Sequence, residues 1–65
     1  MRMRDESAER LAEGVRQACL EAAATAFEQG GFSGLCVEGR IELALDAIRA
    51  LPVERLVREW EAERG

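Results

Sequence analysis

The chain of 65 residues lacks histidine, lysine and tyrosine, and it has only two cysteines. Zinc sites draw their ligands mainly from histidine and cysteine, and disulfide scaffolds are rich in cysteine pairs. The missing lysine leaves arginine as the only basic residue, which we interpret as genomic base bias. We therefore expect no metal, no other cofactor and no disulfide framework.

Long apolar runs and positive charge are also scarce. No apolar run approaches the length of a membrane span or of a signal-peptide core. The net charge of −4 disfavours nucleic acid and anionic membranes as partners, because both are negatively charged. With two thiols and no export signal, we expect a cytoplasmic protein without a nucleic-acid or membrane partner.

The strict alternation of apolar and polar residues that marks a half-buried strand is absent as well. Apolar residues instead recur at steps of three and four, which is the helical period. The sequence predicts an all-α fold and a single domain over residues 1–65, with helices at about 6–29, 34–50 and 52–62. The short loop between the first two predicts an antiparallel helical hairpin, and Pro52 should open a short third helix.

The turn of the hairpin is predicted within residues 30–39, which hold four of the six glycines. Gly31 is the expected left-handed residue that ends the first helix. Phe32 and Phe27 would then make the apolar contact of a Schellman motif. Ser33 would follow as the N-cap of the second helix.

The predicted second helix has an unusually wide apolar surface, roughly twice the arc of about 100° that a surface helix normally shows. A chain this short also has only a marginal core of its own. We therefore predict a homodimer whose four helices enclose one core, as in a four-helix bundle. The expected interface residues are Leu20, Phe27, Val37, Ile41, Leu43, Leu45 and Ile48. The alternative is a monomer in which the third helix folds across the apolar surface.

Cys36 is the candidate for a reactive group. It is expected in the first turn of the second helix, where the helix dipole favours a thiolate. The alternative is that Cys36 is a small buried hydrophobe, and the chain has no histidine to serve as its base. A hairpin turning near residue 31 separates Cys19 from Cys36 by about 10 Å along the axis, so we expect no disulfide between them.

Glu38, Glu42 and Asp46 form a carboxylate column along the second helix. Two such columns could hold a metal across a bundle, but bundle sites of that kind also use a Glu-x-x-His motif. We interpret the column as a solvated strip. Arg40 falls in the apolar sector, so we expect its stem to pack while its head reaches water or a glutamate.

The run Gly-Leu-Cys-Val-Glu-Gly-Arg-Ile-Glu, from Gly34 to Glu42, resembles a segment of small bacterial proteins of unknown function. Those proteins share a Gly-Leu-Cys-x-Glu-Gly core, and some carry an acetyltransferase label. The resemblance covers roughly residues 18–50 and implies a helical hairpin without assigned site residues. The chain departs from the pattern at Ile41, where an aromatic residue is common. The acetyltransferase label is unsupported, because the common fold of those enzymes needs a mixed sheet that this chain cannot hold.

These expectations favour a non-enzymatic helical interaction module that self-associates and presents a surface to a larger protein. A thiol-dependent redox or catalytic function centred on Cys36 is the alternative from another class. A helix-turn-helix regulator or antitoxin fits the hairpin but not the acidic charge.

Overall fold

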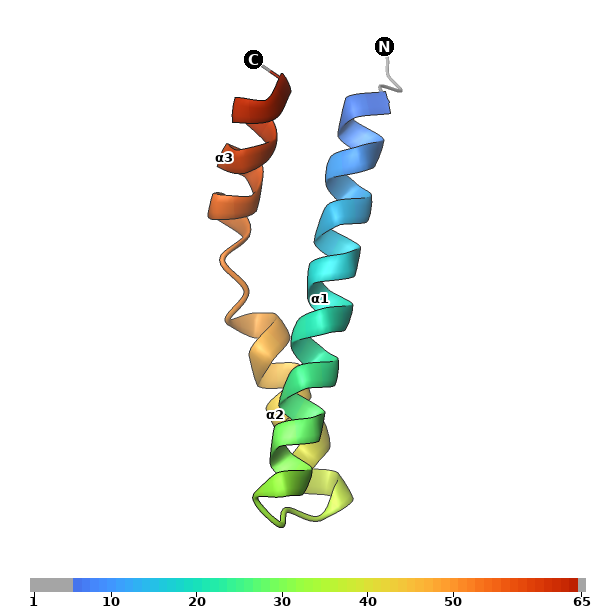
Figure 1. Ribbon diagram of the computed structural model, residues 1–65, viewed down its shortest axis with the longest axis vertical. Coiled ribbons are helices and arrows are strands. Elements are labelled where there is room, and N and C mark those ends of the chain that lie inside the picture. The colour runs from blue at the N-terminus through green and yellow to red at the C-terminus, as the bar shows by residue number, and fades with distance from the viewer. Residues whose placement is uncertain (1–5, 65) are drawn as a thin grey trace.

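The computed structural model describes residues 6–64 and is all-helical over that range, as predicted. Three helices follow one another: α1 (Glu6–Phe32), α2 (Val37–Arg49) and α3 (Val53–Arg64). After α1 the chain turns back, and α2 and then α3 run antiparallel beside it (Figure 1). The three predicted helices and the hairpin are therefore confirmed.

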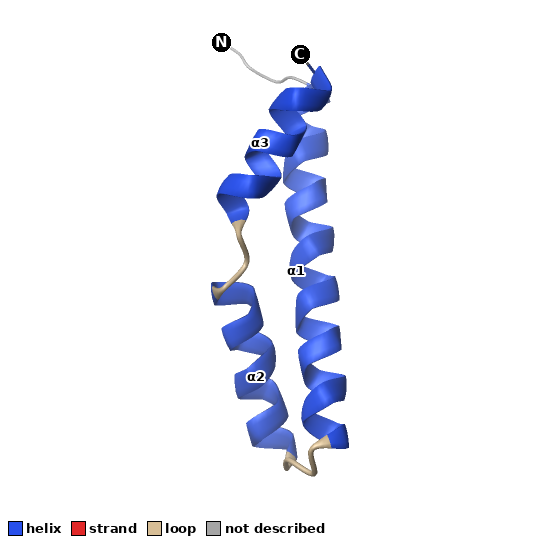
Figure 2. Ribbon diagram, turned by 60° about the vertical axis from the view of Figure 1, so that its left-hand side comes forward, coloured by secondary structure: helices blue, strands red, loops and turns tan. Residues whose placement is uncertain are grey.

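The molecule is a single layer of helices. It measures 48 × 21 × 13 Å, and its smallest dimension barely exceeds the diameter of about 10–12 Å of one helix. Its radius of gyration is 15.1 Å, against about 11 Å for a compact domain of this length. In the described part of the chain, α2 and α3 each pack on α1 and not on one another, so they form two halves of one return arm (Figure 2).

The loop between α1 and α2 is a Schellman motif centred on Gly34, the described glycine with a positive φ (83°). The Leu35 amide donates to the Gly30 carbonyl at 2.9 Å, and the Gly34 amide donates to the Gly31 carbonyl at 3.0 Å. These are the two hydrogen bonds of that motif. The prediction of Gly31 as the left-handed residue was therefore wrong by three positions.

Helix α1 continues through Gly30 and Gly31 because α2 packs closely across this pair. Gly30 is the buried residue of the helix. A Cβ atom at Gly30 would lie 3.1 Å from Cγ of Arg40 and 3.1 Å from Cδ1 of Leu43. At Gly31 it would lie 3.0 Å from Cζ of Arg40. The glycines thus permit close packing of two helices rather than a turn.

The other end of the loop also differs from the prediction. Helix α2 begins at Val37 rather than near residue 34, and its N-cap is Cys36, not Ser33. The Cys36 backbone is extended, and its side chain makes no capping hydrogen bond. Phe32 is 88% exposed and so does not make the predicted contact with Phe27.

Pro52 breaks the return arm between α2 and α3. Its carbonyl accepts hydrogen bonds from the amides of Arg55 (3.0 Å) and Leu56 (3.3 Å), so Pro52 precedes α3 rather than being its first residue. At the far end, Nε1 of Trp60 donates to the Ser7 carbonyl at 2.9 Å and ties α3 to the first turn of α1.

Candidate interaction surface

No hydrophobic side chain in the described part of the chain is fully buried. The apolar stripe of α1 is only partly covered by the return arm, and large apolar side chains of α2 remain accessible. Burial is incomplete because, in a single layer, each helix covers its apolar side chains only along the edge that packs on its neighbour. The surface left over is the feature that any functional proposal has to explain.

The exposed apolar side chains of α2 share one side of that helix. Val37 is 58% exposed, Ile41 47%, Leu45 46% and Ile48 37%. At about 100° per residue, these four fall within a sector of about 80°. Ala44 and Ala47, which are partly buried, lie beside this sector and face α1.

Leu20 of α1, 57% exposed, lies on the same side of the hairpin as that sector. In an antiparallel pair of right-handed helices, residues rotated forward from the contact line on either helix share one side. Gly30 and Arg40 mark that contact line. Leu20 is rotated forward from Gly30 by about 80°, and the α2 sector is rotated forward from Arg40 by about 60–140°. We call Leu20, Val37, Ile41, Leu45 and Ile48 the apolar face.

Of the two remaining predicted interface residues, Phe27 follows Leu20 by seven residues and so lies on the same side of α1, whereas Leu43 lies on the other side of the hairpin. Phe27 is partly buried, because the guanidinium of Arg40 lies over its ring at 5.4 Å from the centroid. Arg40 of α2 therefore covers part of Phe27 within one chain. Leu43 contacts the Gly30 position and borders the opposite side of the hairpin, where it is 38% exposed.

Arg40 closes the loop end of the molecule. Its stem crosses Gly30, its guanidinium lies against Gly31 and over Phe27, and its Nε donates to the Leu35 carbonyl at 3.2 Å. The head group thus meets an aromatic face and a backbone oxygen rather than a glutamate. This set of contacts could not be predicted from residue spacing, because it depends on which helix passes over the glycine pair.

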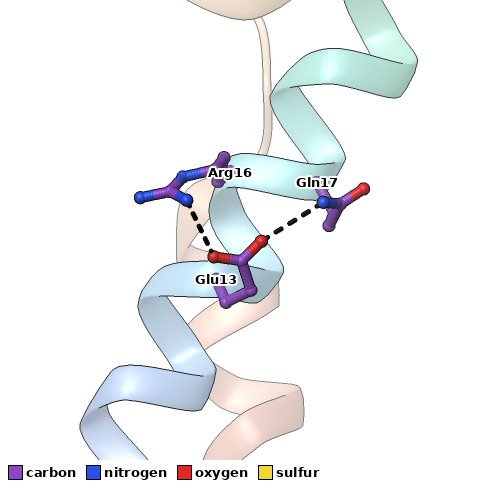
Figure 3. A network of polar contacts seen from close by, with 3 residues as sticks. All are labelled: Glu13, Arg16 and Gln17. Atoms are coloured by element: carbon purple, nitrogen blue, oxygen red, sulfur yellow. Dashed lines mark hydrogen bonds and ion pairs between the residues drawn. The ribbon is translucent and has the colours of Figure 1, made fainter.

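Polar residues of α1 border the apolar face on the N-terminal side of Leu20. Glu13 pairs with Arg16 at 3.1 Å and accepts a hydrogen bond from Gln17 at 3.2 Å (Figure 3). Arg16 and Gln17 lie one turn before Leu20, so the exposed apolar residues of α1 stop there. The side chains of Arg16 and Glu13 are 73% and 51% exposed. Ion pairs this exposed contribute only about 0–1 kcal/mol to the free energy of unfolding.

The carboxylate column borders the face along α2. Glu38, Glu42 and Asp46 are all exposed, and Asp46 pairs with Arg49 at 2.7 Å. Among the described residues, no group of carboxylates and thiols is placed to hold a metal. The column therefore lies where a solvated strip was expected.

A groove of about 490 Å³ separates α1 from α3 on the other side of α1. Leu11, Val15, Leu56 and Trp60 supply apolar walls, and its rim carries Arg10, Glu59 and Glu63. Leu11 is nine residues from Leu20, which is two and a half turns at about 100° per residue, so the two residues lie on opposite sides of the helix. The groove and the apolar face thus lie on opposite sides of α1.

The two thiols are far apart and unpaired. Cys36 is exposed at the turn, whereas Cys19 is partly buried in the middle of α1. Facing pairs such as Gly30 with Arg40 and Val15 with Leu56 place the turn near Leu35 rather than residue 31. The thiols are then about 24 Å apart along the axis at about 1.5 Å per residue, farther than predicted.

None of the described helices is both long and apolar enough to cross a bilayer. Comparison with protein-family models, with curated proteins and with solved structures finds no match for this chain.

Proposed function

We propose that this chain is a non-enzymatic interaction module that works as a homodimer joined through the apolar face. One observation carries the proposal: the hairpin is one layer thick and has no fully buried hydrophobic side chain among its described residues, yet its apolar side chains gather on one side. A second hairpin laid on that side makes a two-layer, four-helix arrangement with an enclosed core.

The position of α3 supports a dimer over a closed monomer. A monomer would need α3 to fold over the apolar residues of α2. Helix α3 instead packs along the first half of α1, beside Leu11 and Val15, and is pinned there by the bond from Trp60 to Ser7. The groove on that side stays clear of the dimer interface and is the surface we assign to a larger protein partner.

Sedimentation equilibrium across nanomolar to micromolar concentrations tests the dimer. We expect a reversible dimer whose melting temperature rises with protein concentration, by mass action. Leu45→Glu should abolish it, because a charge would be buried at the centre of the interface. Phe32→Glu is the matched control: Phe32 is more exposed than Leu45 but lies outside the apolar face, so dimerisation should persist. A single species near 7 kDa at all concentrations would refute the proposal.

A thiol-dependent function is the competing proposal, and the exposure of Cys36 beside the start of α2 is the observation that favours it. The rate of alkylation of the folded protein at neutral pH separates the two. A reaction at Cys36 much faster than that of a cysteine in an unstructured peptide would support the thiol function. An equal or slower rate would reject it.

A further inference from the structure

The exposed side of α2 is nearly symmetric about Leu45. Ile41 precedes Leu45 by one turn, and Ile48 follows it by one turn, and all three belong to the apolar face. The charged residue after each isoleucine has the opposite sign: Glu42 follows Ile41, and Arg49 follows Ile48. Glu42 and Arg49 are seven residues apart, so both lie on the same flank of the helix.

The charges on that flank distinguish antiparallel from parallel pairing of α2 with the α2 helix of a second copy. In an antiparallel pair, each flank faces the same flank of its mate, and in a parallel pair it faces the opposite flank. Charged residues on such flanks set the orientation of paired helices. Only the antiparallel arrangement brings Glu42 of one copy to Arg49 of the other.

Glu42 makes no ion pair within the described part of the chain. Arg49 bonds Asp46 at 2.7 Å, but both side chains are about two-thirds exposed (70% and 67%). A guanidinium offers several N–H donors, so Arg49 can keep this bond and accommodate a second carboxylate. Each chain thus presents an acidic and a basic group to its mate.

We propose that two copies pair antiparallel across α2, with the twofold axis beside Leu45 and Ile41 packed against Ile48 of the other copy. Glu42 of each copy then pairs with Arg49 of the other, and both pairs lie along the same flank. This inference rests on the proposed dimer and adds its orientation and its recognition residues. The loops of the two hairpins lie at opposite ends of the assembly, and both α3 helices remain outside the interface.

A charge-swap series tests the recognition residues. Glu42→Arg and Arg49→Glu each place like charges at both symmetry-related contacts, so each should raise the dimer dissociation constant about tenfold. The double variant E42R/R49E restores opposite charges and should return within about twofold of the natural chain. Glu38→Arg is the control, because it changes the net charge equally but lies outside the symmetric pair. Failure of the double variant to recover affinity would overturn the inference.

The orientation is measured independently by the distance between spin labels on Cys36, in a Cys19→Ala background. Cys36 lies nine residues before Leu45, so the antiparallel dimer separates the two labelled positions by about 27 Å along the helices. Parallel α2 helices would hold them about 10 Å apart. A short distance in a dimer would overturn the orientation while leaving self-association intact, whereas a monomer at every concentration would remove the proposed function and this inference together.

Discussion

The two ends of the hairpin are built from the same kind of contact, helix α1 against the return arm, but they pack differently. At the loop end, Gly30 is buried under Arg40 and Leu43. At the open end, Gly14 lines the groove against α3, and a Cβ atom there would meet nothing within 4 Å. One glycine is required by a close approach, and the other borders empty space.

This difference shows what holds each half of the return arm. Helix α2 is fixed to α1 by close backbone approach and by the several contacts of Arg40, whereas α3 is held by partly buried apolar residues and by the hydrogen bond from Trp60. Segments with fewer buried contacts open more readily. We therefore expect α3 to exchange its amide hydrogens before α2 does.

The largest expected effect comes from filling the close approach. Gly30→Val adds atoms where a Cβ is already 3.1 Å from Arg40 and Leu43, so α2 must move away. We expect a loss of about 1–3 kcal/mol in the free energy of unfolding, measured in urea at fixed protein concentration. Gly14→Val is the matched control and should change stability by less than about 0.5 kcal/mol, because only helix propensity differs. Equal losses of stability at both glycines would refute the proposed difference in packing between the loop end and the open end.

The loop gives the next largest effect. Gly34 has a φ of 83°, and no atom lies within 4 Å of its Cβ position, so any penalty comes from the backbone alone. Gly34→Ala should cost about 1–2 kcal/mol by thermal or urea unfolding. Gly34→Asn should cost clearly less, because asparagine tolerates the left-handed region. If both variants were as stable as the natural chain, the left-handed closure at Gly34 would be refuted.

The helices themselves could be predicted from the sequence, because periodicity and the position of Pro52 depend on local residues. The loop could not be predicted, because Gly30, Gly31 and Gly34 are all glycines and residue type alone does not show which of them adopts the left-handed conformation. Which of them turns the chain depends on Arg40 and Leu43, whose packing needs Gly30 inside the helix rather than after it. Misplacing the turn then shifted the facing pairs and shortened the predicted distance between the thiols.

The apolar face could be predicted in part for a similar reason. The helical wheel places the apolar residues Val37, Ile41, Leu45 and Ile48 on one side of α2, and the structure leaves all four exposed. The helical wheel does not reveal that Arg40 lies over Phe27, because that contact joins two helices and a wheel describes only one. Nor does spacing alone show that α3 packs on the side of α1 opposite Leu20.

At the open end, Trp60→Phe removes the donor that bonds the Ser7 carbonyl at 2.9 Å while keeping an aromatic ring. We expect a loss of about 0.5–1.5 kcal/mol. Hydrogen exchange followed by mass spectrometry should show weaker protection in α3, with α2 as the internal control. Equal loss of protection in α2 and α3 would mean that the two halves of the return arm open together and that α3 is not the more weakly held half.

The smallest effect is a gain. Gly14→Ala should stabilise the chain by about 0.5–1 kcal/mol, because alanine is the better helix former and its Cβ meets no atom within 4 Å. The dimer dissociation constant should not change, since Gly14 lines the groove and not the apolar face. Urea unfolding measures the first quantity and sedimentation equilibrium the second. A stabilised chain that dimerises more weakly would place the second copy in the groove, and the apolar face would lose its assignment as the interface.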